Sequence, residues 1–179
     1  MLLTIDLPSR EEQLAFNRQR WGQLLADRGL ADLPNKIETN AHGLVVMNPP
    51  PSGSHSIRQG EIAYQLRSRL GGHALPECPL STLDGVKAVD IGWYSAQRFR
   101  RVENQTVFEL APEICVEVLS PSNTHGEMGH KKKLYFDAGA KEVWLCQTDG
   151  RMHYFCSQTP DRESPSSGIC PGFPERVSR

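Results

Sequence analysis

The stretch APEICVEVLSPS, residues 111–122, contains the clearest strand pattern in the chain. Its two faces would carry Ile114, Val116 and Val118 on one side and Cys115 and Glu117 on the other. This density of apolar residues indicates a central strand that ends before Pro121. A carboxylate there is costly to bury alone, so Glu117 either faces solvent at a sheet edge or has a charged partner.

The helix predicted over residues 127–138 offers such a partner. One continuous face of it, at positions i, i+3, i+7 and i+10, carries Met128, Lys131, Tyr135 and Ala138. Lysine is almost never fully buried unless it is paired, although its long stem can also carry the ammonium group to solvent. Lys132 and Lys133 rotate away from this face and are expected to be solvated. The helical phase therefore selects Lys131 as the lysine that faces the sheet.

A third unusual residue lies in the strand predicted over residues 86–93. Asp90 interrupts an otherwise apolar run, and aspartate is disfavoured inside strands, so it is either a strand-end turn residue or a functional group. Two carboxylates, Asp90 and Glu117, can hold Mg²⁺ or Mn²⁺ while water and phosphate oxygens fill the other coordination positions. The ammonium group of Lys131 would then stabilise negative charge on a phosphate or orient an attacking water.

The remaining patterns predict an α+β (mixed α/β) fold with a central mixed sheet flanked by helices. Further helices are predicted over 9–29 and 55–70, and further strands over 36–47, 142–146 and 152–156. The helix 55–70 has apolar residues on two nearly opposite faces, so we expect it to pack on both sides, with Glu61 on a partly covered face. Residues 157–168 are polar and rich in proline and serine, which predicts a mobile loop.

Composition narrows the class of protein. The chain has 179 residues, and its 20 Lys and Arg residues balance 21 Asp and Glu residues. This near-neutral charge excludes a polybasic protein of the histone or ribosomal type, so any contact with nucleic acid uses a local patch. The sequence has no apolar run long enough to cross a membrane, and its start meets an acid too early for a signal peptide. We expect a cytoplasmic protein whose five cysteines are reduced and mostly buried.

The stretch 111–122 resembles the P-x-x-x-V-E-V-L-S-P-S signature of the bacterial Uma-two family, which belongs to the PD-(D/E)XK nuclease superfamily. Other matches follow in the family's order: Pro49-Pro50-Pro51-Ser52 with His55, Val89-Asp90-Ile91, Gly129-His130-Lys131, Leu134-Tyr135, Ala138-Gly139, Val143-Trp144-Leu145 and Pro171-Gly172-Phe173. The resemblance covers roughly residues 36–175. It implies a restriction-endonuclease-like αβββαβ core over residues 36–179, preceded by a helical extension over residues 1–35.

The resemblance also implies roles for individual residues. Carried over by position, Asp90 and Glu117 would be the two metal-binding acids and Lys131 would be the lysine. Glu61 would match an extra acid on the first helix, and Glu38 is its competitor for that role. Leu119 stands where the superfamily usually has its lysine, and the family places that lysine on the following helix. Two positions depart from the family pattern, because Val89 replaces a proline and Gln147 replaces an aspartate.

These observations predict a Mg²⁺-dependent endonuclease that hydrolyses phosphodiester bonds in DNA, for which cleavage of both strands would favour a homodimer. Two alternatives stay open at this point. The first is a catalytically inactive DNA-binding or regulatory module on the same fold, which needs no cation at Asp90 and Glu117. The second is an α+β domain of a protein–protein assembly, which predicts a large exposed apolar patch and no acidic cleft.

Overall fold

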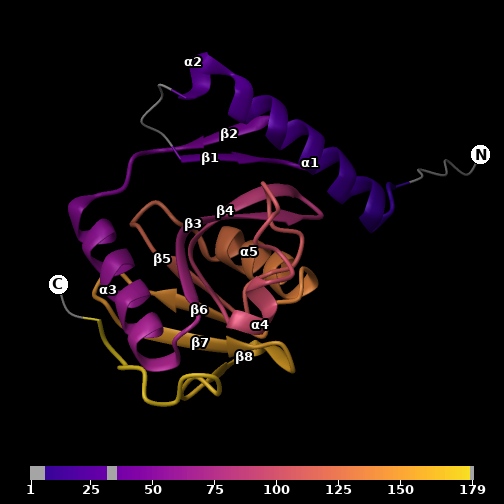
Figure 1. Cartoon of the computed structure of the whole chain (residues 1–179). Helices are drawn as coiled ribbons and strands as arrows, with labels where there is room; N and C mark the ends of the chain where they lie inside the picture. Colours follow the sequence, from indigo (N-terminus) through magenta and orange to yellow (C-terminus); the bar gives the residue numbers. More distant parts are fainter. Residues whose placement is uncertain (1–6, 32–35, 178–179) are drawn as a thin grey trace, which may run out of the picture.

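The computed structural model describes residues 7–31 and 36–177 (Figure 1). In chain order its elements are α1 (Arg10–Ala26), α2 (Arg28–Ala31), β1 (Lys36–Thr39), β2 (Val45–Asn48), α3 (Gly53–Leu70), β3 (His73–Thr82), β4 (Gly85–Tyr94), α4 (Ala96–Phe99), β5 (Ile114–Val118), α5 (His125–Asp137), β6 (Glu142–Cys146), β7 (Met152–Cys156) and β8 (Thr159–Ser164). None of the described helices combines the length and apolarity needed to cross a membrane.

Six strands form one mixed sheet in the order β3-β4-β5-β6-β7-β8, and β1 pairs with β2 in a separate antiparallel sheet. Only β5 and β6 pair in parallel, because the helix α5 connects them as a crossover. The other neighbours in the six-stranded sheet are antiparallel. The predicted α+β fold with a central mixed sheet is therefore confirmed, and β5 lies in the middle of the sheet as its apolar density indicated.

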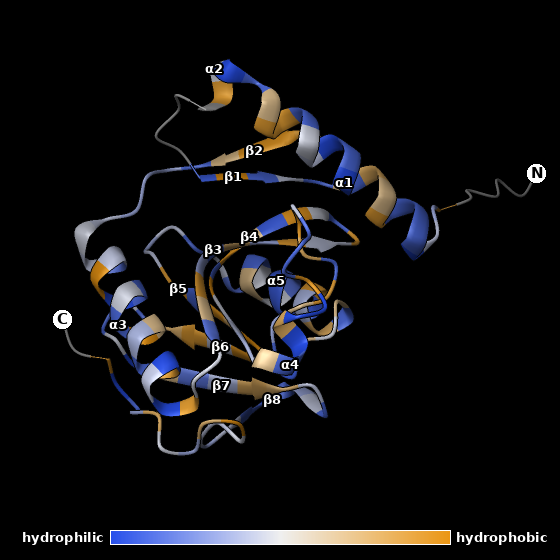
Figure 2. Ribbon diagram, viewed as in Figure 1, coloured by the Kyte–Doolittle hydropathy of each residue, from blue (hydrophilic) through white to orange (hydrophobic). Residues whose placement is uncertain are grey.

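Each face of the sheet has its own apolar core. On one face Ile114, Val116 and Val118 pack with Ile62 and Leu66 of α3. On the other face Cys115 packs with residues of α5 that include Leu134 and Tyr135. Figure 2 shows β6 as strongly hydrophobic, whereas α1 and α3 alternate between hydrophilic and hydrophobic residues. The alternation predicted for β5 is correct, and it turns Glu117 toward α5.

The helix α3 packs on one side only, so the prediction of two packed faces is wrong. Ile62 and Leu66 are fully buried against the sheet. Ile57 and Tyr64, on the second apolar stripe, are 53% and 68% exposed. Single apolar side chains on a surface are common in folded proteins, and periodicity alone cannot separate them from a second packing face.

The helix α1 begins as predicted but packs through polar groups. Ser9 caps it and forms a capping box with Glu12. The helix ends at Ala26, before the predicted closing residue Gly29, which lies in α2. Asn17 is buried because its side chain donates hydrogen bonds to Ser81 Oγ and to the carbonyl of Thr82. The boundary predicted near residue 35 lies outside the described residues.

One strand at a sheet edge differs from the sequence prediction. The expected mobile loop over residues 157–168 contains β8, which pairs with β7. All the residues of β8 are polar or proline, since an edge strand that faces solvent needs no apolar alternation. At the opposite edge β3 includes Pro76 and Pro79, which an edge strand tolerates because one side of its backbone has no partner strand.

Candidate active site

A cavity of about 1040 Å³ opens where β5 ends and where α3 and α5 begin. Ser52 caps α3 and Thr124 caps α5, and Ser52 and Asn123 at the starts of these helices line the cavity. The charged side chains that line the cavity include Lys36, Arg58, Glu77, Asp90, Glu117 and Lys131.

Asp90 and Glu117 come from neighbouring strands and line the same cavity. The antiparallel register pairs Ile91 with Val116, and Asp90 and Glu117 are the next residues of the two strands at the same end of this pairing. Asp90 is 3% exposed and Glu117 is 5% exposed. A solvent-facing edge position for Glu117 and a strand-end turn for Asp90 are therefore both wrong.

Lys131 faces these acids from α5. Its Nζ lies 2.9 Å from Oε1 of Glu38 and 3.6 Å from Oε2 of Glu117, and 12% of its side chain is exposed. Lys132 instead lies over the ring of Phe155, 4.1 Å from the centroid. The exposed Lys133 pairs with Asp137 one turn later on the helix. The helical phase thus selected the lysine that the structure turns inward.

The surroundings of the two acids shift their pKa values in opposite directions. Burial raises the pKa of Glu117 to about 7, and the nearby charge of Lys131 offsets only part of this effect. The Tyr135 hydroxyl donates a 2.5 Å hydrogen bond to the same carboxylate. Burial acts in the same sense on Asp90, but its contact with His55 and the charge of Lys36 outweigh burial and lower its pKa to about 2.

Sequence reasoning missed the groups that hold Asp90. The Nζ of Lys36 lies 2.5 Å from Oδ1 of Asp90 and 3.2 Å from Glu77. Gln59 donates to Glu77 and to the backbone carbonyl of Asp90. Nε2 of His55 lies 3.6 Å from Oδ1 of Asp90. Of these residues around Asp90, only His55 had a signal in the sequence, namely its place in the family signature. The backbone of Glu77 has a φ of 49°, which is uncommon for a residue other than glycine.

The structure brings Glu38 to the site and leaves Glu61 outside it. Glu38 is 4% exposed and accepts hydrogen bonds from Lys131 and from the backbone N–H of Ala88. Neither glutamate lines the cavity itself, but Glu38 contacts the lining residue Lys131, whereas Glu61 accepts a hydrogen bond from Gln65 on its own helix. Gln59 points into the site, and two further residues turn a helix by about 200°, so Glu61 is directed away.

Two carboxylates in this cavity, those of Asp90 and Glu117, are of the kind that binds hard divalent cations. Four carboxylates, from Glu38, Glu77, Asp90 and Glu117, lie beside the ammonium groups of Lys36 and Lys131. Across residues 7–31 and 36–177, no group of three or more His, Cys, Asp or Glu side chains has the arrangement of a metal site. A cation between Asp90 and Glu117 would complete its coordination with water or phosphate oxygens, which is the usual pattern for Mg²⁺.

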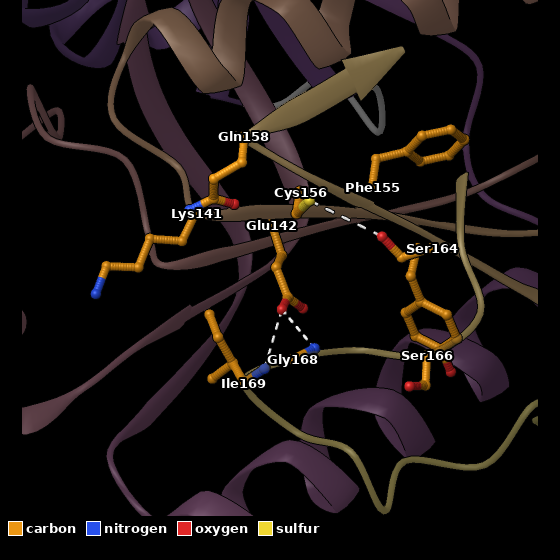
Figure 3. A pocket seen from close by; sticks show the side chains of 10 residues that line it. Lys141, Glu142, Phe155, Cys156, Gln158, Ser164, Ser166, Gly168 and Ile169 are labelled. Atoms are coloured by element: carbon orange, nitrogen blue, oxygen red, sulfur yellow. Dashed lines mark hydrogen bonds between the residues drawn. The ribbon is translucent and has the colours of Figure 1, made fainter. Parts of the chain in front are cut away.

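A second cavity, of about 350 Å³, lies beside β7 and β8 (Figure 3). Glu142 lies at this cavity and is 5% exposed. Its carboxylate accepts hydrogen bonds from the backbone N–H groups of Gly168 and Ile169 and from the side chains of Trp144 and Ser167. These donors satisfy the carboxylate internally, so we assign Glu142 to anchoring the segment around residue 168.

Comparisons with known proteins agree with this architecture. Residues 30–174 match the model of the Uma2 family, whose description is "Putative restriction endonuclease". A solved structure described as "a putative nuclease belonging to DUF820 from Anabaena variabilis ATCC 29413" has a similar fold, with a TM-score of 0.63 and 22% sequence identity. The similarity covers 79% of this chain and 86% of that one. No curated protein matches the chain.

Proposed function

The chain belongs to the Uma2 family, and from this premise we propose that it is a Mg²⁺-dependent nuclease that hydrolyses phosphodiester bonds in DNA. The observation that carries the proposal is that Asp90 and Glu117, on adjacent central strands, line one open cavity with Lys131 beside them. Burying a carboxylate costs free energy unless the group has a partner.

Each residue of the site has a separate role in this proposal. Asp90 and Glu117 would hold the cation. Bound there, Mg²⁺ would supply a water of lowered pKa and would offset negative charge on the phosphate. Tyr135 fixes the orientation of the Glu117 carboxylate through its hydrogen bond. Lys131, which Glu38 holds in place, presents an ammonium group that stabilises charge on a phosphate oxygen.

A cleavage assay with a metal dependence tests the proposal. Supercoiled plasmid and labelled oligonucleotides are incubated with the purified protein in Mg²⁺, in Mn²⁺ and in EDTA. We expect nicking or cleavage with either cation and none in EDTA. Cleavage that persists in EDTA would contradict the proposal. The absence of cleavage together with metal-independent DNA binding would favour an inactive DNA-binding module on the same fold.

A further inference from the structure

Arg58 is a buried arginine without a partner. Its residue is 4% exposed, and among the buried side-chain nitrogen and oxygen atoms of the described residues its Nε is the one that lacks a hydrogen bond. Within residues 7–31 and 36–177 its guanidinium group also forms no ion pair. A buried charge that is left unpaired strongly destabilises a folded protein.

Another arginine of this chain shows what a structural role looks like. Arg98 donates hydrogen bonds to the backbone carbonyls of Ala111 and Gly139, at 2.9 Å and 2.8 Å. It also lies 3.4 Å from the carboxylate of Glu113. Arg98 therefore links separate segments of the fold, whereas the guanidinium group of Arg58 forms no such hydrogen bond or ion pair within the described residues.

Arg58 faces the cavity that contains the acids of the candidate active site. Arg58 lines the same cavity as Asp90, Glu117 and Lys131. It lies three residues after His55 on the first turns of α3, and His55 contacts Asp90. Uncharged polar residues, among them Ser120 and Thr148, also line this cavity.

We propose that Arg58 binds a backbone phosphate of the nucleic-acid strand that occupies this cavity. The planar guanidinium group presents paired N–H donors that match two phosphate oxygens, and its pairing with an anion is strongest where water is excluded. The cavity volume of about 1040 Å³ is sufficient for part of a strand. The proposal rests on the proposed function for the identity of the strand, and it adds a substrate-binding residue to the acids and the lysine.

The test measures the binding of a fluorescent 12-nucleotide single strand and of its duplex by anisotropy, in EDTA and at physiological salt. The variants are Arg58→Gln, Arg58→Lys and the matched control Arg67→Gln, which removes an exposed arginine from the same helix. We expect Arg58→Gln to weaken binding about tenfold or more, because it removes a charge-assisted contact. Arg58→Lys should retain part of the affinity, and Arg67→Gln should lose little, since salt screens exposed charges. An RNA strand of the same sequence shows which sugar the site accepts.

A stability measurement separates binding from a structural role. Arg58→Met should melt at the temperature of the wild type or above it, because it removes an unpaired buried charge without breaking a bond. Arg98→Met should melt at a lower temperature. Inorganic phosphate should raise the melting temperature of the wild type more than that of Arg58→Met, since a ligand stabilises the state that binds it.

The outcomes distinguish this inference from the proposed function. If the wild type cleaves DNA while Arg58→Gln binds and cleaves as Arg67→Gln does, the inference is overturned and the nuclease function stands. If no cleavage occurs but strand binding in EDTA still depends on Arg58, the nuclease function fails and the inference stands. Mn²⁺ affinity measured by calorimetry should be the same in Arg58→Gln and the wild type; a lost metal site would overturn the assignment to phosphate.

Discussion

The backbone N–H of Val118 donates a 2.8 Å hydrogen bond to Oδ2 of Asp90. Val118 follows Glu117 directly, so this bond ties the carboxylate on β4 to the strand that carries the second acid. Asp90 then has its other oxygen, Oδ1, directed at Lys36. The two acids are thus fixed relative to each other by the sheet itself, which is the preorganisation that a metal site on rigid strands requires.

The first prediction concerns Asp90→Asn. The amide oxygen can still accept the hydrogen bond from Val118, but the side chain loses the negative charge that a cation needs. We expect weaker Mn²⁺ binding by calorimetry and a loss of cleavage on the order of 10²-fold or more. The variant must still melt cooperatively, so that a lost activity is not a lost fold. Equal cleavage by the variant and the wild type would mean that a contaminant produces the activity.

The second prediction compares Lys131→Met with Lys132→Met. Lys131→Met should slow cleavage about tenfold or more while Mn²⁺ affinity persists, because an ammonium group stabilises phosphate charge but does not ligate a cation. It should also lower the free energy of unfolding, since Glu38 would lose the partner of its buried charge. Lys132→Met should change cleavage little. Rates are therefore measured well below both melting temperatures, and equal rates for the two variants would contradict the role given to Lys131.

Local periodicity accounts for the parts of the site that the sequence predicted. The face of Glu117 follows from strand alternation, and the choice of Lys131 follows from helical phase, because both depend on residues within one element. The positions of Lys36 and Glu77 depend instead on how distant segments meet, and no short-range pattern encodes that. Glu61 was misplaced for a related reason: α3 has two apolar stripes, and only the packed structure shows which one faces the sheet.

The third prediction compares two glutamates that the sequence left as competitors. Glu38→Gln should slow cleavage, because Lys131 would lose the charged group that positions it in the cavity. Glu61→Gln should leave cleavage unchanged and should alter the free energy of unfolding by no more than about 0.5 kcal/mol, as is usual away from buried networks. Cleavage kinetics and urea denaturation measure both effects. A slow Glu61→Gln beside an unaffected Glu38→Gln would reverse the assignment.

The fourth prediction concerns Glu142, whose carboxylate anchors the segment around residue 168. Glu142→Ala leaves several buried donors without an acceptor, so the free energy of unfolding should fall by about 3 kcal/mol or more. Cleavage at low temperature should persist, because the second cavity is separate from the acids that would hold the cation. Alanine at the exposed Glu103 serves as the control in urea denaturation. A specific loss of cleavage by a stable Glu142→Ala would show that the second cavity has a function.

The last prediction uses Lys36 to detect the cation without any measurement of activity. Lys36→Met removes the ammonium group beside Oδ1 of Asp90, so the buried carboxylate keeps its bond from Val118 and its contact with His55 but loses its closest opposite charge. The variant should melt at a lower temperature than the wild type in EDTA, because an uncompensated buried charge is strongly destabilising.

Mg²⁺ should then raise the melting temperature of Lys36→Met more than that of the wild type, since the cation supplies the missing positive charge and binds only the folded state. Lys133→Met is the control, because Lys133 is exposed and pairs with Asp137 on its own helix, not with Asp90. If saturating Mg²⁺ stabilises neither Lys36→Met nor the wild type, Asp90 and Glu117 do not hold that cation. Equal stabilisation of Lys36→Met, Lys133→Met and the wild type would place the cation away from Asp90.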